Sequence, residues 1–425
     1  MHALTQLIQE DMRPALGVTE PGAIAFAVAT ARSHAGGEIQ KVNLRLNSGM
    51  FKNAFTCGIP GSSRVGNYHA AALGAVAADA SKGLECLEGI SPEAGEKALR
   101  LVEQGRISVE MSGISSRIFI EAQVIAREGE ATVTIRDAHT NIVRIAANGK
   151  IIFEKEQGPA AEDRGLPSIH QYSLRQLAEY ADSVPVEEIR FIAEAYTMNL
   201  ALFEEGLNNP KAVYAPYLLA CNGASVFSQD EQKTASLLCN AAIEARVTGL
   251  NRPAMSITGS GAHGIIATLP LYAACQVGGY SQEALLRATA LSYLVCMYIK
   301  EYSGKLSAFC GCAIAAGTGT ACGLIHLKGG TVEMMERAIR NMASSITGMI
   351  CDGGNQGCVM KGIVAVDAAF ASAKMAMSGV SIDKVHGING STPEETMRNM
   401  GRIASPGMEG TERIIVEILE EKKSV

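Results

Sequence analysis

The sequence lacks the features that mark a nucleic-acid-binding, secreted or disordered protein. It contains no run of basic residues and carries a net charge of −6, so no nucleic acid is expected as a partner. The opening stretch MHALTQLIQEDMRP contains acids and no apolar core of the signal-peptide type, from which we expect a cytoplasmic location. Hydrophobic residues make up 47% and charged residues 19% of the chain, which excludes a disordered polymer.

Charge is missing altogether from two long stretches, which raises the question of a membrane. Residues 306–327 run for 22 positions without Asp, Glu, Lys or Arg, which is long enough to span a bilayer. This stretch lacks the Leu, Ile and Phe density of a lipid-facing helix, and it contains four Gly and three Cys. A second uncharged stretch, 253–282, is interrupted by SITGSGAHG and by Pro270. We therefore predict helices buried in a large core and no membrane partner, and their apolar surface also suits a homodimer.

The length of 425 residues favours two domains, because one core rarely grows to this size. From residue 41 apolar and polar residues alternate in KVNLRLNS, and further alternating segments follow, with a hairpin turn at Asn148-Gly149. This pattern predicts an α+β module with an antiparallel meander at residues 38–156. Residues 157–172 are polar with two Pro and are interpreted as a linker.

Helical patterns fill most of the remaining chain. VEEIRFIAEAYTMNLALFEEGL and ERIIVEILEEKK are amphipathic with the helical period. We predict a large all-helical domain at residues 173–425. The helical patterns in residues 1–37 resemble this second half, so we expect them to pack on it and to make the module an insertion. The predicted fold class is α+β.

Eleven cysteines are too few for a disulfide scaffold in a chain of this length. Cys310 lies in AFCGCA, and Cys351 and Cys358 bracket a Gly-rich loop in MICDGGNQGCVMK. Glycines beside thiolates leave room for inorganic atoms and expose backbone N–H groups to sulfur. Spacing alone leaves open a structural zinc, simple packing, or an iron–sulfur cluster on three of the cysteines. Other cysteines lie singly in apolar contexts and are expected in the core: Cys57, Cys86, Cys221, Cys239, Cys275 and Cys296.

Two Gly-rich motifs present polar residues. PALGVTEPG has too much Pro and Gly for a helix interior, and it predicts a tight turn that presents Thr19 and Glu20 beside the apolar Val18. In SITGSGAHG, Ser260 and Gly261 precede an apolar run, where helix N-terminal N–H groups can face a carboxylate. Ordinary helix-start chemistry is the alternative for this second motif.

Two further motifs contain polar residues near the predicted strands. Lys52 and Asn53 in MFKN follow the first strand, where a cation and an amide can hold a substrate carboxylate. A solvated surface lysine is the alternative. His139, Thr140 and Asn141 in AHTNIV are typical of a turn that connects strands.

Together these motifs resemble the L-cysteine desulfidase family, which is related to the α chain of iron–sulfur L-serine dehydratases. LSAFCG and MICDGGNQGCVMK carry the resemblance most specifically. PALGVTEPG, MFKNAFTCGIPG followed by AAALGA, AHTNIV and MSITGSGAHGIIATLP extend it over nearly the whole chain in the same order.

The resemblance implies a 4Fe–4S cluster held by Cys310, Cys351 and Cys358. It also implies β-elimination from a small amino acid such as L-cysteine or L-serine, giving an enamine that becomes pyruvate and ammonia. An open iron would act as a Lewis acid for the leaving sulfide or hydroxide, and a base would remove the Cα proton. The implied substrate-binding residues are Thr19, Lys52, Asn53, His139, Thr140, Asn141, Ser260 and Gly261.

The chain departs from the family pattern in two motifs. The family turn usually reads G-C-T-E-P, and its Cys is replaced here by Val18, which cannot transfer a proton. The family's polar positions around its Gly-rich loop are Ile257, Ala262 and His263 in this chain. Glu20 or His263 is therefore the expected catalytic acid or base.

We accordingly expect a 4Fe–4S-dependent carbon–sulfur or carbon–oxygen lyase. The main alternative is a cluster-binding homologue with a changed substrate or no desulfidase activity, acting as a sensor or partner protein. A pyridoxal-phosphate lyase with a Schiff-base lysine such as Lys52 is a further alternative.

Overall fold

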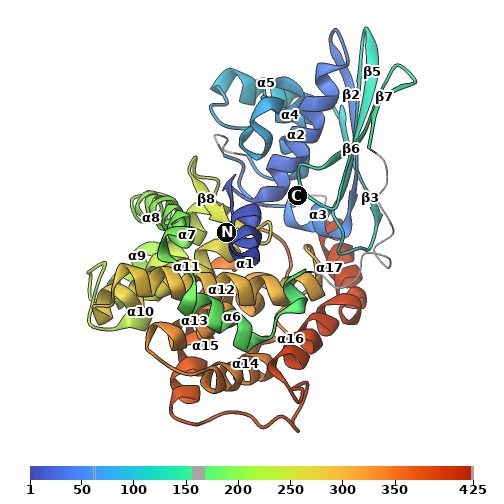
Figure 1. The fold of residues 1–425 in the computed structure, drawn as a ribbon. Helices are drawn as coiled ribbons and strands as arrows, with labels where there is room; N and C mark the ends of the chain where they lie inside the picture. Colours follow the sequence, from blue (N-terminus) through green and yellow to red (C-terminus); the bar gives the residue numbers. More distant parts are fainter. Residues whose placement is uncertain (61, 63, 156–167, 423–425) are drawn as a thin grey trace.

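The computed structural model describes residues 1–60, 62, 64–155 and 168–422 (Figure 1). In this part of the chain, a sheet with helices on one face lies beside a larger helical region. The predicted α+β class is confirmed. Most of the predicted linker, residues 157–167, lies outside the described residues, and the next residues form a short 3-10 helix, η3 (Ser168–Gln171).

The large sheet has six strands in the order β3-β2-β4-β5-β6-β7. β2 and β4 to β7 pair antiparallel, as the alternating segments predict. β3 instead runs parallel to β2, so the prediction of an antiparallel sheet is wrong at this edge. A parallel pair needs a long crossover, and the helices between these two strands supply it. The strands are β2 (Ile39–Asn47), β3 (Ile107–Gly113), β4 (Phe119–Ala126), β5 (Gly129–Arg136), β6 (Ile142–Ala147) and β7 (Lys150–Glu154).

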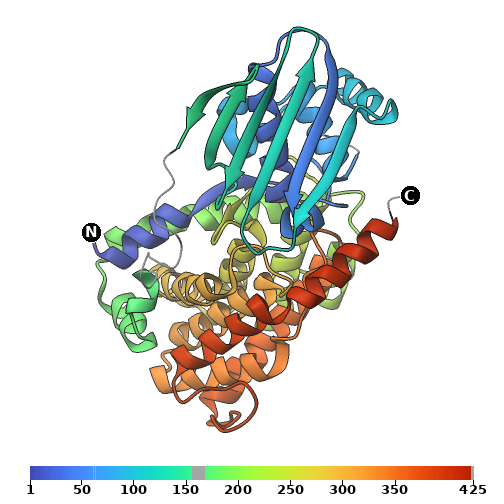
Figure 2. The same ribbon diagram turned by 90° about the vertical axis from the view of Figure 1, so that its right-hand side faces the viewer.

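Helices cover only one face of this sheet. α2 (Thr19–Ser33) and α4 (Gly66–Val76) pack on the strands, and α5 (Pro92–Glu103) packs on α4. Figure 2 shows the opposite face of the sheet, which no described helix covers. Alternate residues of β4 are therefore buried. A short helix, α3 (Ser48–Asn53), follows β2 directly, and a 3-10 helix, η1 (Ala80–Glu85), follows α4.

The first 37 residues divide between the two parts of the molecule. α1 (Ala3–Asp11) contacts α12, and β1 (Arg13–Leu16) pairs antiparallel with β8 (Pro253–Ser256). α2, in contrast, packs against α4, β4 and β5. The expectation that all of residues 1–37 pack on the helical region therefore needs correction for α2. Its buried residues include most of TEPGAIAFAVA, which makes it a core helix of the sheet unit.

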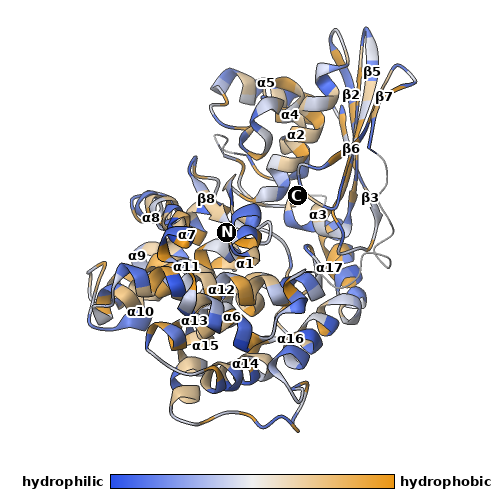
Figure 3. Cartoon of the chain, in the orientation of Figure 1, coloured by the Kyte–Doolittle hydropathy of each residue, from blue (hydrophilic) through white to orange (hydrophobic). Residues whose placement is uncertain are grey.

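The helical region is built around α11 and α12, which are buried over most of their length. Figure 3 shows hydrophobic residues on inner helices and strands and hydrophilic residues along outer turns. α11 continues through Pro270, and a π-helical turn, η5 (Cys312–Ala316), leads into α13. The helices are α6 (Leu174–Ser183), α7 (Val186–Ile189), η4 (Arg190–Ile192), α8 (Ala193–Leu207), α9 (Tyr214–Cys221), α10 (Glu231–Val247), α11 (Gly261–Gly278), α12 (Gln282–Ser303), α13 (Gly317–Leu327), α14 (Val332–Ile346), α15 (Gly357–Met377), α16 (Pro393–Arg402), η6 (Ile403–Gly407) and α17 (Glu409–Glu421).

The two uncharged stretches lie inside this region. Among the described residues, no helix combines the length and apolar character that crossing a membrane requires. Five of the cysteines predicted in the core are buried, but Cys221 at the end of α9 is exposed.

The last helix returns the chain to the sheet unit. α17 packs against α3, and Figure 2 shows it running from the helical region towards the lower end of the sheet. The segments that contain the predicted site residues therefore meet where the two parts of the molecule join.

Candidate functional site

The loops that contain the predicted cluster ligands are joined by backbone hydrogen bonds. The N–H of Cys310 donates to the carbonyl of Met349 over 2.8 Å, and the N–H of Cys351 donates to the carbonyl of Ala308 over 2.5 Å. Cys358 lies in the first turn of α15. All three thiols are free, and Cys310 is buried while the other two are partly buried. The structure thus brings Cys310 beside the loop of Cys351 and Cys358, although Cys358 lies 48 positions after Cys310 in the chain.

The three thiols are close enough to influence one another's ionisation. Burial raises the pKa of Cys358 to about 11, and Cys310 and Cys351 add to this rise. A hydrogen bond with Cys312, followed by burial, raises the pKa of Cys310. Three thiols in such surroundings gain from a bound cation, because a metal ligates and stabilises the thiolate form.

Cationic groups surround these thiols. Lys361, one turn after Cys358, forms an ion pair with Asp352, and this pair together with Cys351 and Cys310 raises its pKa although burial lowers it. Cys358 itself lies in the first turn of α15, where the positive end of the helix dipole favours a thiolate. These positive charges would compensate an anionic group bound by the thiols.

The three thiols have the donor chemistry of an iron–sulfur ligand set. In the described part of the chain, no group of three or more His, Cys, Asp or Glu side chains is placed to hold one metal ion. Three soft thiols beside cations and glycines match the ligand chemistry of such a cluster.

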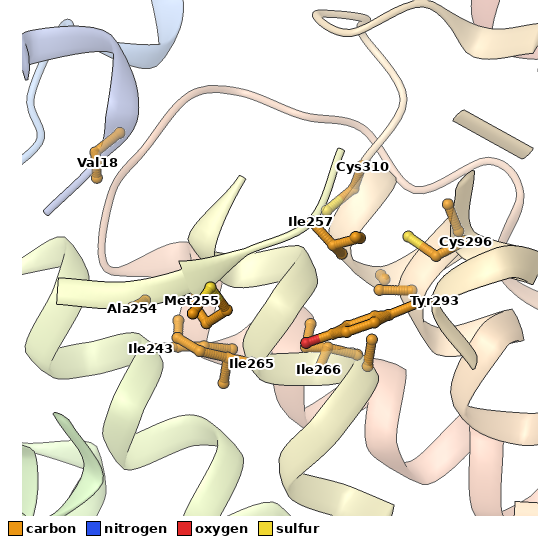
Figure 4. Packing of buried hydrophobic residues seen from close by; sticks show 14 of the residues in the cluster. Val18, Ile243, Ala254, Met255, Ile257, Ile265, Ile266, Tyr293, Cys296 and Cys310 are labelled. Carbon is orange, nitrogen blue, oxygen red and sulfur yellow. The ribbon is translucent and has the colours of Figure 1, made fainter. Parts of the chain in front are cut away.

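The PALGVTEPG motif faces the loop between Cys351 and Cys358. Gly17 has a φ of +64°, after which Val18 is the N-cap residue and α2 begins at Thr19. A Cβ placed on Gly354 would lie 2.9 Å from a methyl carbon of Val18, so this side chain contacts the loop directly. Val18 is buried in the same hydrophobic cluster as Cys310 (Figure 4). The predicted turn is therefore only Gly17 and Val18, and TEPG forms the first turn of a helix.

The carboxylate of Glu20 lies beside two other predicted residues. Asn53 Nδ2 donates to Glu20 Oε1 over 2.9 Å, and His139 Nε2 lies 3.7 Å from the same oxygen. The second distance exceeds a hydrogen bond, so the attraction is Coulombic when His139 is protonated. Burial alone raises the pKa of Glu20, but His139, Asn53 and Arg246 together lower it to about 2. Glu20 is therefore a buried carboxylate that stays ionised at neutral pH.

The neighbours of His139 do not join this site. Thr140 is exposed, and both polar atoms of the Asn141 side chain are occupied by the carbonyl of Arg136 and by Lys155. Thr140 and Asn141 are therefore placed to close the turn between β5 and β6, as the turn interpretation predicts.

Lys52 has a different environment from the one expected. Its Nζ donates to the carbonyls of Ser307 and Cys351 over 3.2 and 2.8 Å, and to Glu412 Oε2 over 2.8 Å. These bonds use all three donors of the ammonium group. The expected contact with a substrate carboxylate needs correction, because Lys52 is placed to hold the segments that lead to Cys310 and Cys351.

The TGSG loop forms a tight turn before α11. Ile257 and Ser260 exchange backbone hydrogen bonds of 3.3 and 3.1 Å, and Thr258 and Gly259 have φ angles of +53° and +78°. A positive φ is strained for a β-branched residue, and such strain gathers at functional sites. Gly261 is the first residue of the helix, and Ser260 is its N-cap without a side-chain capping bond.

The imidazole of His263 has a defined orientation. The Thr258 hydroxyl lies within hydrogen-bond distance of both the carbonyl of Ile257, at 2.7 Å, and Nδ1 of His263. The other ring nitrogen, Nε2, lies 2.8 Å from where a Cβ on Gly311 would stand. Burial, followed by the charges of Lys300 and Arg246, lowers the pKa of His263 to about 3.

Sequence reasoning missed the two cations that act on His263. Lys300 and Arg246 are both buried, with exposed fractions of 5% and 4%. Burial lowers the pKa of Lys300, although nearby thiols oppose this change. A single lysine ending the apolar run LSYLVCMYIK is a usable signal, because charged residues are rarely buried without a role. The local pattern around Arg246 gives no such signal.

Comparison with known proteins confirms the predicted relation to the serine dehydratase α chain, and it names no cysteine desulfidase. The family described as Serine dehydratase alpha chain matches residues 70–417, a span that includes all three predicted cluster ligands. A UPF0597 protein of Clostridium botulinum (strain Okra / Type B1) is 42% identical over 425 residues, covering 98% of each chain. A UPF0597 protein of Caldanaerobacter subterraneus is 36% identical over 421 residues, covering 99% of this chain and 98% of the relative. A UPF0597 protein of Bacteroides fragilis is 36% identical over 423 residues, covering 98% and 97%.

Proposed function

The chain belongs to the serine dehydratase alpha chain family, and on this basis we propose that it is an iron–sulfur-dependent lyase. The proposed reaction is β-elimination from a small amino acid such as L-cysteine or L-serine. The Cα proton moves to a base, a Cα–Cβ double bond forms, and sulfide or hydroxide leaves with the bonding electron pair. The resulting enamine gives pyruvate and ammonia after tautomerisation and hydrolysis. The cysteine desulfidase resemblance of the motifs supports sulfide as the leaving group.

Cys310, Cys351 and Cys358 are the proposed ligands of a 4Fe–4S cluster. The observation that carries this proposal is their convergence from separate segments into surroundings that contain cations, glycines and a helix N-terminus. When bound, the cluster would supply a Lewis acid for the negative charge of the leaving group. Lys52 would act as a positioning residue, because it bonds the carbonyl of Cys351 itself.

His263 is the proposed acceptor of the Cα proton. Its Nε2 faces Gly311, which adjoins Cys310, and in the tautomer with the proton on Nδ1 this nitrogen carries the accepting lone pair. The low pKa keeps the imidazole neutral in the resting protein. A substrate that adds negative charge beside Lys300 and Arg246 would offset their repulsion and raise the proton affinity of His263.

Glu20 is the proposed partner for the substrate ammonium group, with a second role in proton transfer. It is 6% exposed and is held by Asn53, so it presents a fixed negative charge. Thr19 lies beside it, and Thr19 Oγ1 has no hydrogen-bond partner among the described residues. A buried hydroxyl without a partner is free to bind a ligand.

Anaerobic purification tests the first part of the proposal. Iron and sulfide analysis should find about four of each per chain. Release of pyruvate is then measured with L-cysteine and L-serine. A folded protein without iron would refute the cluster. An intact cluster without turnover on these or related amino acids would favour a sensor or partner protein, the alternative that Val18 supports. The buried, fully bonded Lys52 no longer supports a pyridoxal-phosphate lyase based on that residue.

A further inference from the structure

The side chain of Arg246 is buried without an ion-pair partner among the described residues. Arg246 lies in the last turn of α10 and is 4% exposed. Its Nε has no hydrogen-bond partner, and no carboxylate of the described residues lies within 4.0 Å of the side chain. A buried charge without compensation destabilises the folded state, so proteins rarely retain one for stability alone. Lys52, also buried, shows the usual solution, because Glu412 pairs with it.

The side chain of Arg246 points at the start of α11. A Cβ placed on Gly261, the first residue of the helix, would lie 2.8 Å from Nε of Arg246 and 3.2 Å from its Cδ. The first N–H groups of an α-helix have no partner within the helix, and Ser260 supplies no side-chain cap here. A buried cation and a free helix N-terminus therefore share one small volume, which favours an anion.

A negative charge lies near this volume but does not fill it. Glu20 and Arg246 form no ion pair within 4.0 Å, although the charge of Arg246 helps to lower the pKa of Glu20. Both charges also act on the buried thiol of Cys57, which responds to Cys358 as well. The two opposite charges thus act on each other and on the same thiol without forming an ion pair.

We propose that Arg246 and the first turn of α11 bind the α-carboxylate of an amino acid whose ammonium group is held by Glu20. A zwitterionic α-amino acid has its ammonium and carboxylate groups on the same carbon, and it would compensate both buried groups at once. This inference rests on the proposed function for the identity of the substrate. The inference assigns to Arg246 the selection of α-amino acids with a free carboxylate, since a planar guanidinium matches a carboxylate through two parallel hydrogen bonds.

Ligand binding without turnover tests this assignment. L-Alanine has the charged groups of the substrate but no leaving group, and L-alaninamide lacks the carboxylate. Calorimetry on the anaerobic, cluster-loaded protein should show that L-alanine binds more tightly than L-alaninamide, by roughly tenfold or more. Arg246→Met should lose this preference by weakening L-alanine alone. Arg252→Met removes an exposed arginine paired with Glu205 and should bind both ligands like the wild type.

A stability measurement separates a ligand-binding role from a structural one. Arg246→Met removes an unpaired buried charge, so its melting temperature should equal or exceed that of the wild type. If this variant does not fold, Arg246→Lys replaces it. The lysine keeps the charge but loses the two-pronged geometry, and it should weaken L-alanine severalfold without affecting L-alaninamide.

The outcomes distinguish this inference from the proposed lyase activity. Wild-type affinity for L-alanine in a folded Arg246 variant would overturn the carboxylate site, whether or not the protein releases pyruvate. If Arg246→Met loses the preference for L-alanine and the wild type shows no turnover, the carboxylate site is supported and the lyase reaction is rejected. Active Arg246→Met with an unchanged KM would overturn the site and leave the lyase intact.

Discussion

Lys52 and Glu412 form a buried ion pair of 2.8 Å between residues that are 360 positions apart in the chain. The pair joins α3 to α17, and Lys52 also bonds the carbonyls of Ser307 and Cys351. The C-terminal helix is thereby linked through one ammonium group to the segments that contain two of the proposed cluster ligands.

Removing one member of this pair should destabilise the protein strongly. Lys52→Met leaves Glu412 buried and uncompensated, and we expect the free energy of unfolding to fall by about 3–5 kcal/mol. Urea denaturation of the metal-free protein measures this change. The double variant with Glu412→Leu should recover much of the loss, because no charge then remains buried. Lys82→Met, which breaks an exposed pair with Glu88, should leave the free energy of unfolding nearly unchanged.

Iron content in these variants tests the positioning role. If Lys52 holds the ligand segments, the double variant should refold but bind iron less completely than the wild type. Full iron content together with recovered stability would show that the pair serves stability alone.

The low pKa of Glu20 predicts a specific dependence of stability on pH. A carboxyl whose pKa falls from 4.5 to about 2 on folding stabilises the protein above pH 4.5, and this contribution is lost between pH 4.5 and 2. Glu20→Gln should therefore be less stable than the wild type at pH 7, on the order of 3 kcal/mol. The difference should shrink as the pH falls. If the difference in free energy of unfolding between Glu20→Gln and the wild type is the same at pH 7 and pH 3, the carboxylate is not stabilised by its neighbours.

Replacement of the proposed ligands should abolish the cluster selectively. Cys310→Ala, Cys351→Ala and Cys358→Ala should each lose most of their iron and the visible absorbance of the cluster under anaerobic conditions. Cys322→Ala is the matched control, since Cys322 is buried in α13 and is not a proposed ligand. Normal iron content in any of the first three variants would remove that residue from the ligand set.

Val18 provides the test of the desulfidase resemblance. Val18→Cys introduces a thiol of similar size against the Gly354 loop, and we expect it to increase sulfide release from L-cysteine. Val18→Ala is the control, because it changes the packing without adding a thiol. If sulfide release rises in both variants, the added space in the pocket is responsible and not the thiol. If it rises in neither variant, the proton donor is a different residue.

Local patterns were enough to locate most elements. The alternation in KVNLRLNS predicted β2, and Asn148-Gly149 forms the predicted hairpin turn with φ angles of +49° and +76°. Parallel pairing of β3 with β2 could not be read in the same way. A period of two defines a strand and its two faces, but it carries no information about the direction of the neighbouring strand.

The candidate site likewise has features that the sequence predicts and features that only the folded structure shows. The sequence by itself determined which residue types are present and which motifs carry them, including the three cysteines, the TEPG turn with Val18, and the loop before α11. Only the tertiary structure decided that Lys52 is engaged by Glu412 and that Arg246 is buried without an ion-pair partner among the described residues. The reason is physical: a side chain's charge is fixed by its identity, whereas its compensation depends on groups that folding brings from distant parts of the chain.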